Sequence, residues 1–97
     1  MNESDEVAAL RSKANAGDAG GQFSLGNAYF SGQGVPQDDV EAAAWYLKAA
    51  EQGDAVAQTT LGFMYDNGLG VPQDDVQAVS WYRRAAEQGL FRGGRLS

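Results

Sequence analysis

Apolar residues recur at intervals of three and four positions along most of the chain, the spacing that places side chains on one face of an α-helix. The clearest case lies in 38–53, where Ala42, Trp45, Tyr46 and Ala49 fall on a single face. Similar spacing, bounded by glycine and aspartate, predicts helices at about 6–16, 18–31, 38–53, 55–66 and 75–88. The pattern therefore indicates an all-α protein of about five helices.

Glycine, proline and aspartate mark the ends of these helices. The turn at 31–37, SGQGVPQ, contains two glycines, which adopt backbone angles forbidden to other residues, and a proline, which cannot continue a helix. Asp38 follows this turn as a candidate N-cap, and Asp74 stands in the equivalent place later in the chain. Each is followed by a second aspartate, Asp39 or Asp75. We interpret both pairs as helix caps rather than as catalytic or metal-binding carboxylates, because a helix N-terminus favours negative charge.

One segment of the sequence occurs twice. Residues 34–53 return as 70–89 at an offset of 36, and over the full unit 22 of 36 positions are identical. A period of this length is typical of stacked helical units. Gly20 and Gly21 are unusual for a helix interior and predict that the helix at 18–31 frays or starts late. We divide the single domain 1–97 into a polar, frayed start at 1–5, a partial helix at 7–17, repeat 1 at 18–53, repeat 2 at 54–89 and an irregular tail at 90–97.

The repeated residues resemble the Sel1-like repeat, a relative of the tetratricopeptide repeat. The motifs that carry the resemblance are A-x-A-Q-x-x-L-G-x-x-Y in 55–65, G-x-G-V-P in 68–72 and A-x-x-W-Y-x-x-A-A-x-x-G in 78–89, and the same signature appears in 21–53. The resemblance implies an α-solenoid of antiparallel helix pairs that serves as an interaction or adaptor module, often in bacteria. Some members carry disulfides and have been connected with β-lactam binding or hydrolysis, and this chain, without cysteine, matches that branch poorly.

Charge and composition exclude several classes of function. The net charge of −6 argues against nucleic acid and anionic membranes, which both attract surfaces rich in lysine and arginine. The sequence contains no histidine and no cysteine, which removes the commonest general base and the usual zinc ligands. An enzyme would have to rely on carboxylates alone, so we expect no enzyme, no metal and no cofactor. The acidic N-terminus and the lack of an apolar run of ~20 residues predict a cytoplasmic protein.

Positions at which the two repeats differ point to a binding surface. They lie at spacings of four and three along the first helix of each repeat, away from the stripe of leucine, glycine and tyrosine that the repeats share. They are Phe23, Asn27 and Phe30 in repeat 1, and Thr59, Phe63 and Asp66 in repeat 2. Exposed aromatic side chains often mark a protein partner, and burial by the neighbouring repeat is the alternative interpretation.

Two functions follow as hypotheses. The first is a protein-protein interaction module that binds an apolar peptide or partner surface on the concave face formed by these six residues. The second is a small self-associating protein whose homodimer completes the repeat stack, because fewer than three complete repeats bury little core. The candidate residues for this dimer interface are Trp81, Leu90 and Phe91.

Overall fold

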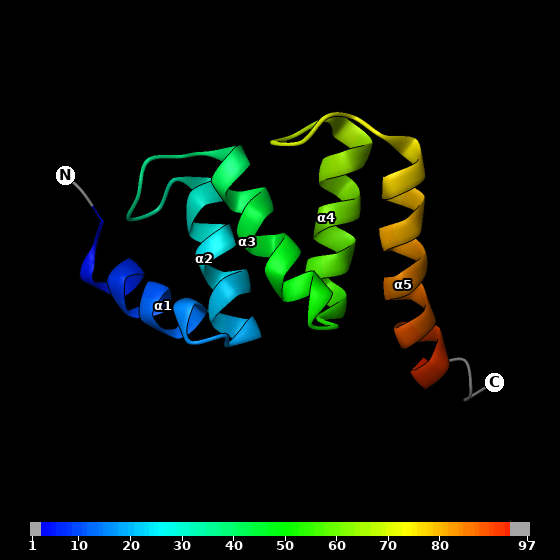
Figure 1. Ribbon diagram of the computed structural model, residues 1–97, viewed down its shortest axis with the longest axis horizontal. Helices are drawn as coiled ribbons and strands as arrows, with labels where there is room; N and C mark the ends of the chain where they lie inside the picture. Colours follow the sequence, from blue (N-terminus) through cyan, green and yellow to red (C-terminus); the bar gives the residue numbers. More distant parts are fainter. Residues whose placement is uncertain (1–2, 94–97) are drawn as a thin grey trace.

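The computed structural model describes residues 3–93 and, for 90–93, the backbone alone. The described chain consists of five α-helices and no strand: α1 Asp5–Asn15, α2 Ala19–Ser31, α3 Asp39–Glu51, α4 Ala55–Asn67 and α5 Asp75–Gly93. The helices follow one another in a row along the longest axis of a molecule that measures 49 × 27 × 18 Å (Figure 1). Extensive contacts join each helix to the next one in sequence. The predicted all-α solenoid is confirmed.

Aspartate side chains cap the helices as the sequence predicts. Asp38 accepts hydrogen bonds from the backbone N–H groups of Val40 and Glu41 at 3.0 and 3.1 Å. Asp74 makes the equivalent pair of bonds at the start of α5 with the same two lengths. Asp18 accepts from the N–H of Gly21 at 2.7 Å. These bonds satisfy backbone donors that the first turn of a helix leaves free, which explains the aspartates without a catalytic or metal-binding role.

The core repeats with the sequence. In each unit a tyrosine ring of the second helix lies against a glycine of the first. A Cβ atom on Gly26 would come within 2.8 Å of the Tyr46 ring, and one on Gly62 would come equally close to Tyr82. The absence of a side chain therefore sets how closely the two helices of a unit approach. The shared leucines, Leu25 and Leu61, are both fully buried.

A ladder of glutamines connects consecutive units. The Gln58 side chain is 2% exposed and donates from Nε2 to the Ala50 carbonyl oxygen at 3.1 Å. Its Oε1 atom accepts from Gln88 Nε2 at 2.9 Å. The preceding unit has the same arrangement, in which Gln22 donates to the Ala14 carbonyl oxygen and accepts from Gln52. Each buried glutamine thus bonds to the helix before it and to the helix after it.

The turn between α4 and α5 is pressed against the start of α3. Gly70 has a φ of +73°, in the left-handed region that favours glycine. A Cβ atom at this position would overlap the backbone carbonyl oxygen of Asp39. Gly70 therefore satisfies two requirements, one of backbone conformation and one of space.

Two expectations about helix ends are wrong. α2 starts at Ala19 rather than late. Gly21 is buried where α1 passes close by, and a Cβ atom there would approach Lys13 Cβ to 2.7 Å, so the contact requires glycine. α5 continues to Gly93, so 90–93 are helical and not irregular. Gly89 lacks the positive φ of its counterpart Gly53, and 94–97 lie outside the described residues.

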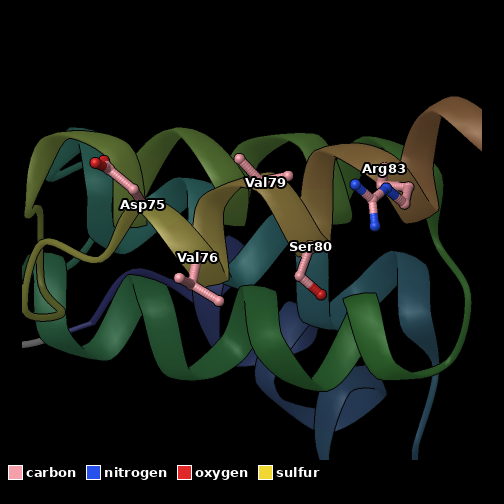
Figure 2. Close-up of a pocket in the computed structure, with 5 residues that line it drawn as sticks. All are labelled: Asp75, Val76, Val79, Ser80 and Arg83. Atoms are coloured by element: carbon pink, nitrogen blue, oxygen red, sulfur yellow. The ribbon is translucent and has the colours of Figure 1, made fainter.

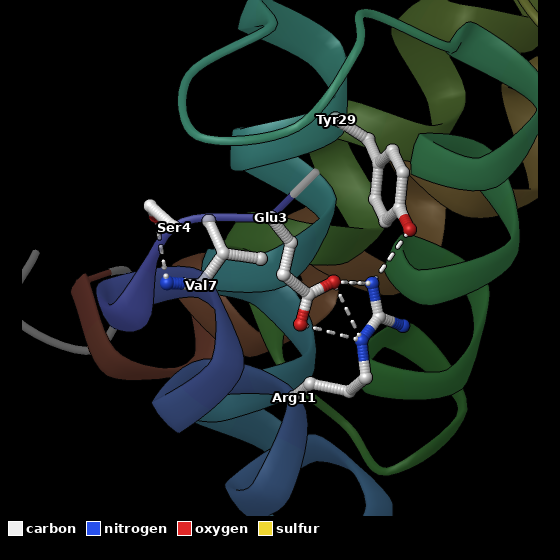
Figure 3. Close-up of polar contacts among 5 residues, drawn as sticks. All are labelled: Glu3, Ser4, Val7, Arg11 and Tyr29. Carbon is white, nitrogen blue, oxygen red and sulfur yellow. Dashed lines mark hydrogen bonds and ion pairs between the residues drawn. The ribbon is translucent and has the colours of Figure 1, made fainter. Parts of the chain in front are cut away.

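The predicted fraying of residues 1–5 is wrong for the described part of that segment. Ser4 caps α1 by accepting from the Val7 N–H at 3.1 Å. The Glu3 carboxylate pairs with Arg11, whose Nη2 atom lies 2.6 Å from Glu3 Oε1 and donates to the Tyr29 hydroxyl at 2.7 Å (Figure 3). These contacts fasten the start of α1 to α2.

We expect the Glu3–Arg11 pair to make stability depend on pH. The hydrogen bond from Arg11 lowers the pKa of Glu3 below its ordinary value of 4.5. A lowered pKa means that the stabilisation is present above pH 4.5 and is lost as the pH falls through the folded-state pKa. Glu3→Gln should therefore lower the melting temperature slightly at pH 7 and leave it unchanged at pH 2. A difference between variant and wild type that persists at pH 2 would contradict this account.

Candidate protein-binding surface

The six predicted partner-binding residues lie on α2 and α4, and most of them are exposed. Phe30 and Phe63 are 38% and 47% exposed, unusually high values for phenylalanine. Asn27, Thr59 and Asp66 are exposed as well, whereas Phe23 is half-buried. Partial burial thus concerns Phe23 alone, and the aromatic ring that it contacts, Tyr46, belongs to the same repeat.

Two of these residues meet at one tyrosine. The ring centroids of Phe23 and Tyr46 are 5.5 Å apart. Asn27 Oδ1 accepts a hydrogen bond of 2.6 Å from the Tyr46 hydroxyl. Burial, and secondly the negative charge of Asp39, raise the pKa of Tyr46 to about 12. The structure therefore joins Phe23 and Asn27 through α3.

Thr59, Phe63 and Asp66 on α4 are arranged differently from the three residues on α2. Phe63 occupies the position of Asn27 and offers no acceptor to Tyr82. The pKa of Tyr82 is raised by burial and secondly by the charge of Asp66. Thr59 donates to the carbonyl oxygen of Ala55 in its own helix at 3.1 Å. The face of α4 therefore has an aromatic ring, Phe63, where α2 has the hydrogen-bonded amide of Asn27. It has a carboxylate, Asp66, where α2 has the ring of Phe30.

A hollow between α1 and α2 borders this surface. Asn27 lies at its edge, and the apolar side chains Val7, Leu10 and Ala28 line it. Polar residues complete the rim, namely Glu6, Ser24 and Gln33. In volume it is about 230 Å³. An apolar side chain of a bound peptide has room to enter here.

The candidates for a dimer interface are placed less favourably. Trp81 is 7% exposed and belongs to the core, and the Arg84 guanidinium lies 4.5 Å from the centre of its ring. Its burial within the chain leaves almost no surface for a second copy. The side chains of Leu90 and Phe91 lie outside the described residues.

Sequence reasoning missed an apolar surface on the outer side of α5. Val76 is 79% exposed and Val79 is 51% exposed. Together with Asp75, Ser80 and Arg83 they line a shallow hollow (Figure 2). Comparison of the repeats could have revealed it, because Val79 replaces Ala43, which is buried in repeat 1.

Two other features bear on the class of protein. Among residues 3–93, no group of three or more carboxylates gathers in a way that could hold a metal ion. In the same range, no helix combines the length and the apolar character needed to cross a bilayer.

Comparison with known proteins identifies relatives. The family model of the Sel1 repeat matches residues 19–54 and 55–90. A Sel1 repeat protein from Oxalobacter formigenes is 43% identical, with a TM-score of 0.84, over 86% of this chain and 63% of that one. The antigen c5321 of uropathogenic Escherichia coli, described as protective and as displaying an SLR fold, is 46% identical, with a TM-score of 0.81, over 82% of this chain and 17% of its own.

A third structure, cysteine-rich protein B of Helicobacter pylori, is 29% identical, with a TM-score of 0.82, over 86% of this chain and 62% of that one. The chain thus spans less than two thirds of each of these three proteins. No curated protein sequence matches it significantly. The two family matches cover most of the chain and coincide with the helical units of the structure, and the protein belongs to the Sel1 repeat family.

Proposed function

We propose that the protein is a non-catalytic protein-binding module that takes an apolar peptide, or an apolar segment of a larger partner, across the face of α2 and α4. The surface consists of Phe23, Asn27, Phe30, Thr59, Phe63 and Asp66. Membership of a family of interaction modules supports the general class of function. The choice of this surface and of an apolar ligand is the specific part of the proposal.

The observation that carries it is the exposure of Phe30 and Phe63. Neither phenylalanine is needed by the repeat, because the equivalent position is Asp66 for Phe30 and Asn27 for Phe63. Aromatic rings are enriched among the residues that dominate the energy of protein interfaces. A large apolar side chain left in water at a position free to be polar is best explained by a partner that covers it.

The test starts from a phage-displayed library of random dodecapeptides selected on the wild-type protein. Selected peptides should be rich in apolar residues and should bind at least tenfold more weakly to the variant Phe30→Ser/Phe63→Ser, since truncating a central aromatic contact weakens binding by ~2 kcal/mol. Affinity is measured by fluorescence anisotropy, and circular dichroism checks that helicity is retained.

A matched control is Val40→Ser on α3, which removes an apolar side chain that is 65% exposed and lies on neither α2 nor α4. It should leave peptide affinity unchanged. If the selected peptides bind the double phenylalanine variant as tightly as the wild type, the proposed surface is wrong.

A second candidate function is self-association into a homodimer that extends the stack. The exposed valines of α5 favour it, because the described part of the chain leaves this side of the last helix uncovered. The predicted interface residue Trp81 does not contribute, since its ring is buried within the chain.

A further inference from the structure

The outer face of α5 corresponds to a face that is covered in repeat 1. On α3, Ala43 and Ala50 are 4% and 0% exposed, and Leu47 packs against the core that α3 shares with α4. The equivalent residues of α5 are Val79, Arg83 and Ala86, and all three are exposed. The side of α5 that the next helix of a stack would cover is therefore free in the described part of the chain.

The residues that differ between this face of α5 and the equivalent face of α3 are not those expected of a surface that faces solvent. The terminal units of repeat proteins normally carry polar outer faces, which keep the stack soluble. Here Val79 stands where the covered helix has alanine, so the exposed position is the more apolar of the two. Arg83 stands where the covered helix has leucine. The face therefore combines an apolar centre with a charge at a defined place, as specific interfaces do.

The order of charges along α5 is self-complementary. Asp75 precedes Val79 by four residues and Arg83 follows it by four, so the three share one side of the helix (Figure 2). When two copies of such a helix lie antiparallel with their Val79 residues in contact, Asp75 of each faces Arg83 of the other. A two-fold symmetric interface requires this reciprocity, in which residue i meets residue j and residue j meets residue i.

We propose that this face binds a second copy of the same chain, through an antiparallel α5–α5 pair centred on Val79 and closed at both ends by Asp75–Arg83 ion pairs. The proposal rests on self-association, the second candidate function above, and specifies its geometry. Asp75 can accept a hydrogen bond from Arg83 of the second copy, because the bond that it accepts from Gln73 Nε2, at 2.6 Å, uses Oδ1 alone. Val76 and Ser80 flank the contact on one side. The pairing leaves Phe30 and Phe63, on α2 and α4, outside the contact.

The test is a charge exchange followed by sedimentation equilibrium of the full chain from micromolar to millimolar concentration. Asp75→Arg alone places two arginines opposite each other at both ends of the interface, and Arg83→Asp alone places two aspartates there. Each single variant should weaken dimerisation roughly tenfold, because two ion pairs become two like-charge pairs. The double variant restores opposite charges. The dissociation constant of its dimer should lie within about threefold of the wild-type value, as pairing of the two sites requires.

Val79→Glu supplies an independent variant, because it brings two carboxylates together at the centre of the interface and should abolish the dimer. Val56→Glu, on α4, is the matched control and should leave dimerisation unchanged. Circular dichroism confirms that each variant is folded. A wild type that stays monomeric throughout overturns both self-association and this geometry. A dimer that is insensitive to the charge exchange and to Val79→Glu overturns the geometry alone, and places the interface elsewhere.

Discussion

Replacing Gly70 with alanine is expected to lower the free energy of unfolding by roughly 3–5 kcal/mol. The left-handed backbone of this residue, at a φ of +73°, disfavours any side chain by about 1–3 kcal/mol. In addition, the new Cβ atom would overlap the Asp39 carbonyl oxygen, and forcing an atom into packed structure costs a further 1–3 kcal/mol or so. A domain of this size has a total stability of only about 5–15 kcal/mol, so the variant should be largely unfolded at moderate urea concentration. Urea denaturation followed by circular dichroism measures the loss.

Gly68→Ala is the matched control for this prediction. Gly68 lies in the same turn with a similar φ of +66°, but the nearest atom to its Cβ position, Gln73 Cβ, is 3.3 Å away. Its substitution should therefore cost mainly the backbone strain, about 1–3 kcal/mol, without the overlap that adds to the loss at Gly70. Equal losses in the two variants would show that contact with α3 does not matter at Gly70.

Replacing Gln58 with leucine is expected to lower the free energy of unfolding by roughly 2–3 kcal/mol. The substitution keeps most of the volume but removes two hydrogen bonds, one to the Ala50 carbonyl oxygen and one from Gln88. Loss of buried hydrogen-bond partners typically costs about 1–3 kcal/mol. For a domain of this length, that corresponds to a decrease in melting temperature on the order of 10 °C. Differential scanning calorimetry measures it.

Gln77→Leu is the control for the second prediction. Gln77 is an exposed residue of the first turn of α5, and its side chain is outside the glutamine ladder. Surface substitutions of this kind usually change stability by less than about 0.5 kcal/mol. If the two leucine variants melt at the same temperature, the ladder contributes little to stability.

Much of the fold could be predicted because its determinants are local and occur twice. Asp38 and Asp74 mark the starts of α3 and α5, and their capping bonds depend only on residues two and three positions away. Gly26 and Gly62 occupy equivalent places in the two units, and so do Tyr46 and Tyr82, the tyrosines that they contact. Repetition identifies such residues even without knowledge of the packing.

The features that could not be predicted depend on contacts between distant residues or on the lack of a neighbour. Nothing in the sequence indicates that Glu3 pairs with Arg11 and, through it, with Tyr29. Gly53 ends α3 where Asp54 caps the next helix, whereas Gly89 is followed by Leu90, which has no side-chain acceptor. Without a new cap, α5 continues through the glycine. The propensity of glycine alone could not decide between the two outcomes.

The candidate binding surface was predicted in part. Comparison of the two repeats identified Phe30 and Phe63 as free to vary, and the structure places both in solvent. The same comparison also contained the Ala43-to-Val79 change on α5, but its meaning depends on whether a further helix covers that face. Trp81 lies on the apolar stripe and is buried within the chain, but the stripe alone does not tell which helix buries it.

Extensive contacts between successive helices have a consequence for how the molecule opens. Unfolding of α1 removes its contact with α2 and leaves the contacts between the later helices intact. The chain can therefore unfold stepwise from an end instead of all at once. Interactions between near neighbours in sequence also form quickly, since little chain entropy is lost in bringing them together. Amide hydrogens in α3, the middle helix of the row and the furthest from both ends, should then be the slowest to exchange with solvent.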